Sequence, residues 1–547
     1  MNTRNRRTLH HFMGITALSA MLGLGGAATS ALADEPSLSP EDFEHAKTLY
    51  FQRCAGCHGV LRKGATGGSL EPDVSRDLGQ HRLERIIALG TEGGMNNFDH
   101  IFTPEEIEMV ATYIQMEPPT PPEMPLELMR ERTHRHVALD AYPNEPQHDR
   151  NWKNFFVVIE RDAGQVAIVD GDRHEIVAHI ETGYAVHVIK GQEKNSSVQG
   201  GTPGRFWYTM GRDGKMTKID LWQTPDNMLV AETQIAYDAR DVAVSGDGKY
   251  VIGGGYWPPH FVIVDAHTME PLKVVSSRGI NIDGEYVEES RVAAIYDTPN
   301  APTWLVAMKE LGQMWQVDYS DIDNLRIEQM DTAKFLHDGF FDPTGRYFQI
   351  AANASDTMVV VDAQTRKTEA LIEVDTLPHP GPGANWNDPE CGPVAGTVHL
   401  GLGTLTAWGN DPSGHPDHAW KVCYTVETDG PGLFVRTHPN SQYVWADQTI
   451  HPEPEVQQAV QVIDKNSREI VRTIQVTEAP GSVAVHMEFN ADGTEVWVSV
   501  WNQGDAGEAN GEIVVYDAET LEEKARIKGL TTPTGKFNVF NRKNHVT

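Results

Sequence analysis

Residues 166–170 read Val166-Ala167-Ile168-Val169-Asp170, an apolar strand that ends in an aspartate and is followed by a polar turn. The same unit recurs at Asp220, Asp265, Asp318, Asp362, Asp464 and Asp517, with a degenerate copy at Trp408-Gly409-Asn410-Asp411. Successive marker aspartates are 50, 45, 53, 44, 49, 53 and 53 residues apart. Four-stranded units that repeat at this interval are typical of a β-propeller, so the eight markers predict eight blades.

Four histidines and one arginine follow these aspartates at similar offsets. His187 and His379 come 17 residues after their marker, His337 comes 19 after, Arg240 comes 20 after and His486 comes 22 after. Equivalent positions in successive blades lie at equivalent heights, so these side chains are expected to converge on one mouth of the channel. A single histidine is more often a surface or core residue, but several in the same phase indicate a shared site.

A second motif lies near the N-terminus, where Cys54-Ala55-Gly56-Cys57-His58 has the spacing of covalent c-type haem attachment. The thiols of Cys54 and Cys57 add to the two vinyl groups of one porphyrin, and His58 is then held against the iron as an axial ligand. A thioredoxin-like redox pair is the alternative, but it leaves His58 unexplained. A haem that carries electrons makes a redox cofactor the favoured occupant of the histidine ring.

Helices are expected on both sides of this motif. Ser39 suits the cap of a helix that begins at Pro40, and Thr103 suits the cap of a helix that begins at Pro104. The loop between them presents Met95, whose thioether is predicted to be the sixth ligand of the haem iron. Met95 could instead fill the core. The competing ligands are His81, His100 and Met109.

The chain therefore divides into two unlike parts. Residues 34–116 form a predicted small all-α cytochrome c domain, and residues 151–547 form a predicted all-β, eight-bladed propeller. The linker over residues 117–150 begins with a proline-rich run, residues 117–125, that can form neither a helix interior nor a central strand. This run is expected to be a stiff, extended spacer.

The first 33 residues have the pattern of a cleaved export signal. Arg4, Arg6 and Arg7 precede an apolar stretch over residues 13–28, and residues 31–33 read Ala-Leu-Ala, as at a signal-peptidase site. A membrane anchor is the alternative, although the apolar stretch is short and interrupted by Gly and Ser. We expect a periplasmic mature protein that starts near Asp34. It should have no membrane span, because no later segment approaches about 18 consecutive apolar residues.

Charge and cysteine usage limit the partners and the compartment. The formal net charge of −32 disfavours nucleic acid and anionic membrane surfaces, although a small anion could still reach a local positive pocket. Cys391 and Cys423 could form a disulfide in an exported protein, or they could remain two buried thiols.

The haem-attachment run resembles a known family. Residues 51–67, Phe-Gln-Arg-Cys-Ala-Gly-Cys-His-Gly-Val-Leu-Arg-Lys-Gly-Ala-Thr-Gly, look like the haem c site of the cytochrome cd1 nitrite reductases. The similarity extends to residues 532–539, Thr-Pro-Thr-Gly-Lys-Phe-Asn-Val, and covers essentially the whole expected mature chain. It implies two cofactors, a covalent haem c and a non-covalent haem d1.

Carried over residue by residue, the resemblance implies a haem d1 site in the propeller. His187 matches the proximal ligand of the haem d1 iron, and His337 and His379 match a distal pair that binds nitrite and supplies protons. The other matching pocket positions, which contact the cofactor carboxylates or line the pocket, are Arg161, Arg212, Arg240, Tyr256 and Thr534.

Some positions depart from the family pattern. Pro382 follows His-Pro-Gly where many members have Arg, and His486 stands where a late motif has Gln. Either one cofactor carboxylate is held differently, or His486 replaces a hydrogen bond. Some members also place a tyrosine from an N-terminal arm over haem d1. No tyrosine lies between Asp34 and Leu49, so this gate is expected to be absent.

The resemblance implies a nitrite reductase that converts nitrite to nitric oxide with one electron. Haem c would take that electron from a small soluble donor, a c-type cytochrome or a cupredoxin, and pass it to haem d1. His337 and His379 would protonate the oxygen that leaves as water. A homodimer is expected from the resemblance alone. Two alternatives stay open, a haem d1 biosynthetic dehydrogenase of the same plan and a non-enzymatic d1-binding electron carrier or chaperone.

Overall fold

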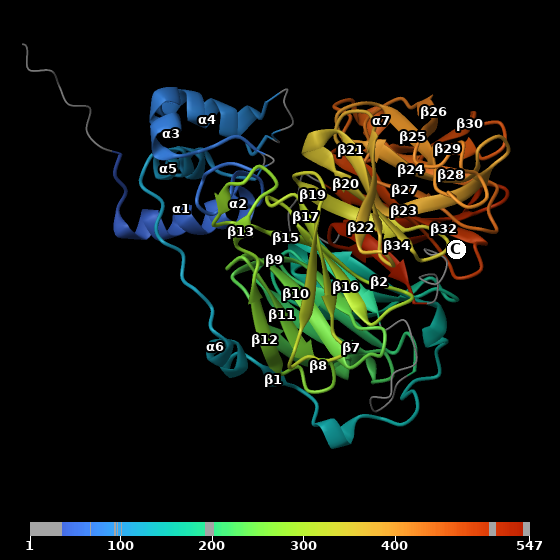
Figure 1. Ribbon diagram of the computed structural model, residues 1–547, viewed down its shortest axis with the longest axis horizontal. Helices are drawn as coiled ribbons and strands as arrows, with labels where there is room; N and C mark the ends of the chain where they lie inside the picture. Colours follow the sequence, from blue (N-terminus) through green and yellow to red (C-terminus); the bar gives the residue numbers. More distant parts are fainter. Residues whose placement is uncertain are drawn as a thin grey trace, which may run out of the picture.

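A computed structural model of the 547-residue chain describes residues 36–65, 67–91, 95, 97–99, 101–191, 202–502 and 510–539. A helical unit lies against one face of a ring of β-sheets (Figure 1). The predicted export signal, residues 1–33, lies outside the described residues. In the described ranges, no helix combines the length and the apolar character that crossing a membrane requires.

The helical unit confirms both predicted helix starts. Its helices are α1 (Pro40–Arg53), α2 (Ala55–His58), α3 (Pro72–Leu78), α4 (Gln80–Leu89) and α5 (Pro104–Ile114). The Ser39 hydroxyl accepts a hydrogen bond from the Asp42 amide, and Thr103 forms a reciprocal capping box with Glu106. Helices α3 and α4 were not predicted, because they are only 7 and 10 residues long and each buries only two side chains.

The segment between the two parts runs along the propeller as an ordered strap. Residues 117–125 contain no helix or strand. They are followed by α6 (Leu126–Glu131), β1 (His134–Arg135) and η1 (Leu139–Ala141). Met124, Met129 and Tyr142 are buried in one apolar cluster with propeller side chains, and β1 pairs with an outer strand of the second blade. Apolar burial therefore fixes most of this segment to the propeller surface.

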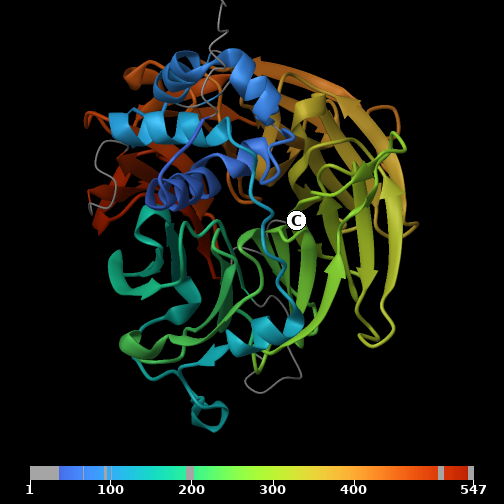
Figure 2. The same ribbon diagram turned by 90° about the vertical axis from the view of Figure 1, so that its left-hand side faces the viewer.

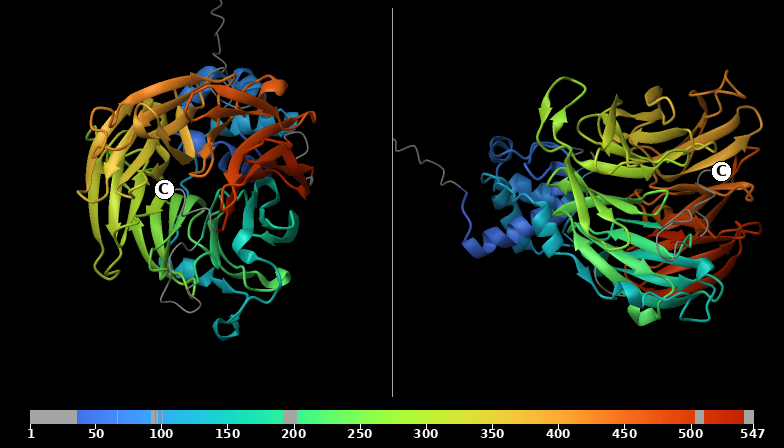
Figure 3. Two further views of the ribbon diagram at one scale, coloured as in Figure 1. Left: turned by 90° about the vertical axis from the view of Figure 1, so that its right-hand side faces the viewer. Right: turned by 60° about the horizontal axis from the view of Figure 1, so that its bottom comes forward.

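Within the described residues, the propeller has eight blades of four main strands around a central axis (Figure 3). From the channel outward, the first two blades are β35 (Pro533–Asn538), β2 (Phe155–Glu160), β3 (Gln165–Asp170), β4 (Glu175–Glu181), and β5 (Val188–Gly191), β6 (Phe206–Met210), β7 (Lys215–Asp220), β8 (Leu229–Gln234). The third and fourth are β9 (Asp238–Val244), β10 (Tyr250–Trp257), β11 (His260–Asp265), β12 (Pro271–Ser276), and β15 (Val292–Asp297), β16 (Thr303–Met308), β17 (Gln313–Asp318), β18 (Arg326–Asp331).

The remaining four blades have the same plan. The fifth and sixth are β19 (Leu336–Phe341), β20 (Tyr347–Ala352), β21 (Thr357–Asp362), β22 (Lys367–Glu373), and β23 (Pro378–Asp388), β24 (Gly392–His399), β25 (Thr404–Gly409), β26 (Val422–Glu427). The seventh and eighth are β27 (Val435–Thr437), β28 (Tyr443–Asp447), β29 (Ala459–Asp464), β30 (Ile470–Gln475), and β31 (Ser482–Phe489), β32 (Glu495–Asn502), β33 (Gly511–Asp517), β34 (Glu523–Leu530). The predicted fold class is confirmed.

Short elements fill the connections between these strands. A small hairpin, β13 (Gly279–Ile280) and β14 (Tyr286–Val287), stands between the third and fourth blades. The other short elements are η2 (Trp152–Asn154), η3 (Arg161–Ala163), η4 (Pro225–Asn227), η5 (Asn353–Ser355) and α7 (Pro454–Gln457).

The marker aspartates recur because each one shapes the same turn. Seven of the eight markers are the last residue of the third strand of their blade, and the degenerate copy at Asp411 lies two residues beyond β25. The carboxylate accepts hydrogen bonds from backbone amides two and three residues later, as at Asp362 with Gln364 and Thr365. This side-chain-to-backbone turn reverses the chain into the outermost strand.

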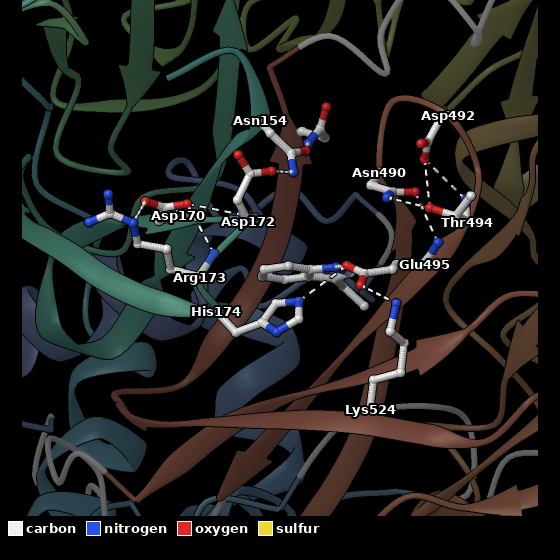
Figure 4. Close-up of polar contacts among 12 residues, drawn as sticks. Asn154, Asp170, Asp172, Arg173, His174, Asn490, Asp492, Thr494, Glu495 and Lys524 are labelled. Atoms are coloured by element: carbon white, nitrogen blue, oxygen red, sulfur yellow. Dashed lines mark hydrogen bonds and ion pairs between the residues drawn. The ribbon is translucent and has the colours of Figure 1, made fainter. Parts of the chain in front are cut away.

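The ring is closed by the last strand, β35, which pairs with β2 as the innermost strand of the first blade. At the adjoining seam, the turn after β3 meets the turn between β31 and β32 (Figure 4). His174 Nε2 of the first blade lies 3.2 Å from Glu495 Oε2 of the eighth, and Lys524 Nζ lies 2.6 Å from Glu495 Oε1. The first and eighth blades are thus joined by polar side chains as well as through the strand pairing that closes the ring.

A disulfide lies within the sixth blade. Cys391 and Cys423 are bonded with their Cα atoms 6.4 Å apart, so the first of the two alternatives left open by the sequence is the one observed. The bond joins the turn between β23 and β24 to the outermost strand, β26.

Candidate active site at the mouth of the propeller

The innermost strands of four blades begin with the same backbone device. Ala185, Phe335, Leu377 and Thr532 have positive φ values of 46°, 64°, 58° and 46°, which are uncommon for residues other than glycine. Each lies two residues before a predicted site residue: His187, His337, His379 and Thr534, respectively. The structure therefore gives these four side chains equivalent places in their blades; the repeat phase predicted this for the three histidines, whereas Thr534 came from the family resemblance alone.

Irregular strand pairing adjusts several of these side chains further. The pairing of β19 with β20 shifts register between Leu336 and Gly339, which brackets His337. The pairing of β31 with β32 shifts between Val485 and Met487, and His486 between them has a φ of 50°. Bulges re-aim side chains next to functional sites, and here they lie on the strands that line the channel.

His337 and His379 come together across the fifth and sixth blades. Their ring centroids are 5.0 Å apart, with an interplanar angle of 50°. Asp338 Oδ1 lies 2.6 Å from His337 Nδ1 and 3.7 Å from His379 Nε2. His379 Nδ1 donates to the Leu433 carbonyl at 2.6 Å, which leaves its Nε2 directed to the Asp338 side. The three side chains form one proton-holding group.

The Asp338 carboxylate and the neighbouring imidazoles influence each other's pKa. Burial lowers the pKa of His337, and the Asp338 carboxylate opposes that effect. Burial alone would raise the pKa of Asp338, but the two imidazoles outweigh it and the pKa lies below its usual value. Asp338 is therefore ionised and favours protonated imidazoles beside it. The donor atoms of the three residues lie within 4.8 Å of one another, a spacing that also suits a shared cation.

His187 lies among arginines at the start of β5. Burial, followed by the charges of Arg212 and Arg240, holds its pKa well below the usual value, so the imidazole is neutral. Although protein surrounds the residue, its side chain keeps exposed surface, as expected at the rim of an open channel. A neutral imidazole with a free face is the form that ligates iron.

Arg161, Arg212 and Arg240 form a cationic cluster around this histidine. Arg240, followed by burial and Arg161, lowers the pKa of Arg212 to about 10. Arg212 Nε is buried and has no hydrogen-bond partner in the part of the chain that the structure describes. Arg240 pairs with Asp238, and Arg161 pairs with Asp162 at 3.1 Å and lies 5.2 Å from the centre of the Trp501 ring. Among the described residues, Arg212 alone of the three has no ion pair, and a carboxylate of a bound ligand would supply one.

The remaining predicted pocket residues come from the third, first and eighth blades. Tyr256 is buried beneath Arg240, 4.4 Å from ring centre to guanidinium carbon. Thr534 is half-buried on the innermost strand β35. The His486 ring meets Phe434 edge-on at 4.7 Å, and Phe434 meets His379 at 5.8 Å. His486 Nε2 is buried and has no partner among the described residues, so it is free to serve a bound ligand.

The haem-attachment turn has the form that covalent attachment requires. Cys54 and Cys57 are not bonded to each other; Cys54 directly precedes the single turn α2, and Cys57 lies within it. His58 Nδ1 lies 2.7 Å from the Gly68 carbonyl, which fixes the ring and leaves Nε2 for the iron. Figure 2 shows the helical unit over the face of the propeller ring. A haem on this turn would therefore lie over the propeller.

Met95 is half-buried in the apolar cluster of the helical unit. Of its competitors, His81 is almost wholly exposed and pairs with Glu84, Met109 packs in the same cluster, and His100 lies outside the described residues. Met95 stays the predicted sixth ligand.

Three functional candidates were missed by the sequence patterns. Asp338 follows His337 directly, so a search for carboxylates beside the phased histidines would have found it. Asp447, at the end of β28, accepts the amides of Leu433, Phe434 and His486 and so holds two walls of the site together. Glu289 contacts the haem-attachment turn, and only the folded chain reveals this long-range pairing.

Two family models match this chain. The model described as Cytochrome D1 heme domain matches residues 150–542, and the model described as Cytochrome C oxidase, cbb3-type, subunit III matches residues 41–114. Together they cover the propeller and the helical unit.

Full-length relatives share both parts. A protein named nitrite reductase from Stutzerimonas stutzeri is 44% identical, over 97% of this chain and 98% of its own. A dihydro-heme d1 dehydrogenase from Pseudomonas aeruginosa is 30% identical, over 91% of this chain and 94% of its own. The solved structure of the dihydro-heme d1 dehydrogenase NirN in complex with DHE has a TM-score of 0.68 at 29% identity and covers 92% of this chain and 100% of that one.

Proposed function

The chain belongs to the family of cytochrome d1 haem proteins with a fused cytochrome c domain, and on that basis we propose that it reduces nitrite to nitric oxide and water. The reaction consumes one electron and two protons. The single observation that carries the proposal is the pair His337 and His379, which share an ionised Asp338 at the same mouth as His187. Two linked proton donors suit a reaction in which an oxygen must leave as water.

Two cofactors are expected from the donor sets. Cys54 and Cys57 would bind haem c covalently, with His58 and Met95 as axial ligands. His187 would hold haem d1 from the proximal side, and the carboxylates or polar edge of that group would meet the residues Arg161, Arg212, Arg240, Tyr256, His486 and Thr534. The uncompensated positive charge around Arg212 supports an acidic ligand at this place.

The side chains of this protein then have distinct tasks. When bound, haem d1 would supply an iron that binds nitrite and receives the electron delivered by haem c. Positive charge at the mouth attracts the anion despite the negative charge of the whole protein. His337 and His379 hold protons at the nitrogens that face the substrate and donate them to the departing oxygen. The Asp338 carboxylate raises the pKa of His337 against the lowering effect of burial, and solvent returns protons to the imidazoles after each turnover.

A dihydro-haem d1 dehydrogenase is the alternative that the relatives raise. The higher identity to the nitrite reductase, 44% against 30%, favours the reductase. The paired histidines favour it as well, because the oxygen that leaves as water must receive two protons.

The setting of the enzyme is part of the proposal. The N-terminal residues 1–33 would direct the chain to the periplasm, where a c-type cytochrome or a cupredoxin would supply electrons. The Cys391–Cys423 disulfide supports an oxidising compartment. We further propose that the mature protein works as a homodimer.

The proposal is tested by exporting the protein to the periplasm of a host that makes haem d1. Acidified acetone removes haem d1 but leaves the covalent haem c in place. The protein should form nitric oxide from nitrite with a reduced donor before extraction and after return of haem d1, but not between. Nitric oxide formation by the extracted protein would refute the assigned site. Haem d1 binding without any nitrite turnover would favour the carrier or chaperone.

A further inference from the structure

The haem-attachment turn is held to the propeller by two side chains from one short segment. Glu289 Oε1 accepts a hydrogen bond from the Val60 amide at 2.7 Å, and Oε2 accepts one from the Leu61 amide at 3.0 Å. Arg291 Nη1 donates to the Gly56 carbonyl at 2.6 Å. Both residues directly precede β15, the innermost strand of the fourth blade.

These contacts include hydrogen bonds to backbone amides that lie beyond the end of helix α2. Helix α2 ends at His58, so the amides of Val60 and Leu61 need acceptors outside the turn. Gly59, with a φ of 83°, brings the chain so close that an added Cβ would lie 3.2 Å from Glu289 Oε2. One carboxylate therefore holds the backbone immediately after the predicted iron ligand.

Arg291 is itself fixed from the propeller side. Its Nε donates to Glu310 Oε1 at 2.6 Å, its amide donates to Glu310 Oε2 at 2.7 Å, and its side chain is only 1% exposed. A guanidinium with a fixed geometry positions its acceptor more strictly than a flexible cation does. The Gly56 carbonyl is thus attached to a rigid part of the fourth blade.

The same turn also touches the proposed haem d1 site. A Cβ on Gly56 would lie 2.8 Å from Arg240 Nη2, so the turn packs directly on a guanidinium of the cationic cluster. The Arg240 and Arg291 guanidinium carbons both lie near the Tyr256 ring, at 4.4 and 5.1 Å from its centre. The propeller side of the docking contact and the cofactor pocket are therefore built from shared side chains.

We propose that Glu289 and Arg291 are positioning residues that clamp the haem-attachment turn on the mouth of the propeller and so set the rate of electron transfer from haem c to haem d1. This inference rests on the proposed function, since it requires both haems. The clamp acts on backbone atoms at both ends of the turn, Gly56 on one side of His58 and Val60 with Leu61 on the other. Its hydrogen bonds go to the backbone of the turn, and Arg291 also lies 5.1 Å from the centre of the Tyr256 ring.

Glu288 provides a matched control next to the clamp. Its carboxylate is about half exposed and lies 3.5 Å from Lys63 Nζ, also across the two parts of the chain. Exposed ion pairs of this kind contribute little, whereas a part-buried carboxylate that accepts two backbone amides contributes more. Glu288→Gln and Glu289→Gln make the same substitution at adjacent residues.

The test uses the full protein loaded with both haems. Haem c is reduced in a rapid pulse, and its reoxidation and the reduction of haem d1 are followed at their separate absorption bands. Glu289→Gln and Glu289→Ala should slow the transfer about tenfold or more, because charge-assisted hydrogen bonds to the turn are lost. Arg291→Lys should slow it as well, while Glu288→Gln should stay within about twofold of the wild type.

Amide hydrogen exchange gives an independent readout of the clamp itself. In Glu289→Gln the amides of Val60 and Leu61 should exchange faster, while the Gly59 amide, bonded to the Ala55 carbonyl, should not change. Transfer at the wild-type rate together with unchanged exchange would overturn the proposal. Failure of the proposed function would be seen separately, as an absence of nitric oxide from the fully reduced wild-type protein.

Discussion

The imidazoles of His337 and His379 lie with their centroids 5.0 Å apart at the start of neighbouring innermost strands. They come from two blades and are separated by 42 positions in the chain, yet Asp338 joins them into one group. The propeller thereby brings one histidine from each of two successive blades into a single group.

The first prediction concerns this pair. The double variant His337→Ala, His379→Ala should retain both haems but lose nitrite reduction by about 100-fold or more, because general acid catalysis is removed from the oxygen that leaves. The measurement is kcat with haem d1 content determined on the same sample. His415→Ala, which removes an imidazole from an exposed turn, is the control. Full activity in the double variant would reject the pair as proton donors.

The second prediction concerns Asp338 and pH. The ionised carboxylate raises the pKa of His337 against the lowering effect of burial, so Asp338→Asn should lower that pKa further. Activity requires protonated imidazole and falls as pH rises through this pKa. The alkaline limb of the kcat profile should therefore move to lower pH in Asp338→Asn. An unchanged alkaline limb would show that Asp338 does not control the proton donors.

The third prediction is that Arg212→Gln weakens haem d1 binding but does not destabilise the protein that lacks haem d1. In Arg212→Gln a buried cation that is opposed by Arg240 and Arg161 is removed, so the protein without haem d1 should keep or gain thermal stability. Its affinity for haem d1 should fall about 10- to 100-fold, because charge-assisted hydrogen bonds are lost. Haem d1 titration and thermal unfolding measure the two effects. Arg472→Gln, an exposed arginine paired with Glu522, should change neither. A loss of stability with full affinity would contradict the cluster as a cofactor site.

The fourth prediction concerns the seam that closes the propeller (Figure 4). Burial would raise the pKa of Glu495, but hydrogen bonds from His174, Lys524 and Trp497 outweigh it and lower the pKa to about 2. Since the folded pKa lies below the ordinary value of 4.5, Glu495 stabilises the fold at neutral pH, and this contribution disappears as pH falls from about 4.5 towards 2.

Glu495→Gln should therefore lower the free energy of unfolding at pH 7 by about 1–2 kcal/mol, with solvent screening taken into account. The difference from the wild type should shrink when urea unfolding is repeated near pH 3. Glu522→Gln, which breaks an exposed pair on the same blade, should have little effect at either pH. A difference that does not depend on pH would show that the carboxylate charge does not stabilise the seam.

Much of this architecture could be predicted because the repeat has a local cause. Each marker aspartate accepts the amides of its own turn, so the marker is visible in sequence wherever the turn is needed. The similar offsets of His187, His337 and His379 from their marker aspartates also have a local cause. Each histidine stands two residues after a residue with a positive φ at the start of an innermost strand.

Other features depend on contacts between distant segments and left no local pattern. Glu289 is one acidic residue among several in its stretch, and only the fold brings it to Val60 and Leu61. Asp447 looks like any strand-ending aspartate until its oxygens are seen to accept amides from the segment before β27 and from β31. The proline-rich run over residues 117–125 was expected to be an extended spacer, whereas the burial of Met124 near its end and of Met129 in α6 fixes the chain to the propeller.

The central claim is that one haem d1, held by His187 and faced by His337 and His379, reduces nitrite. Its most direct measurement is a single turnover, in which the fully reduced protein with both haems is mixed rapidly with nitrite while nitric oxide and haem c oxidation are recorded. The account predicts one nitric oxide for each bound haem d1, with haem c oxidised afterwards, and no such burst from the His337→Ala, His379→Ala variant. Absence of nitric oxide from the wild-type protein, or an equal burst from that variant, would contradict it.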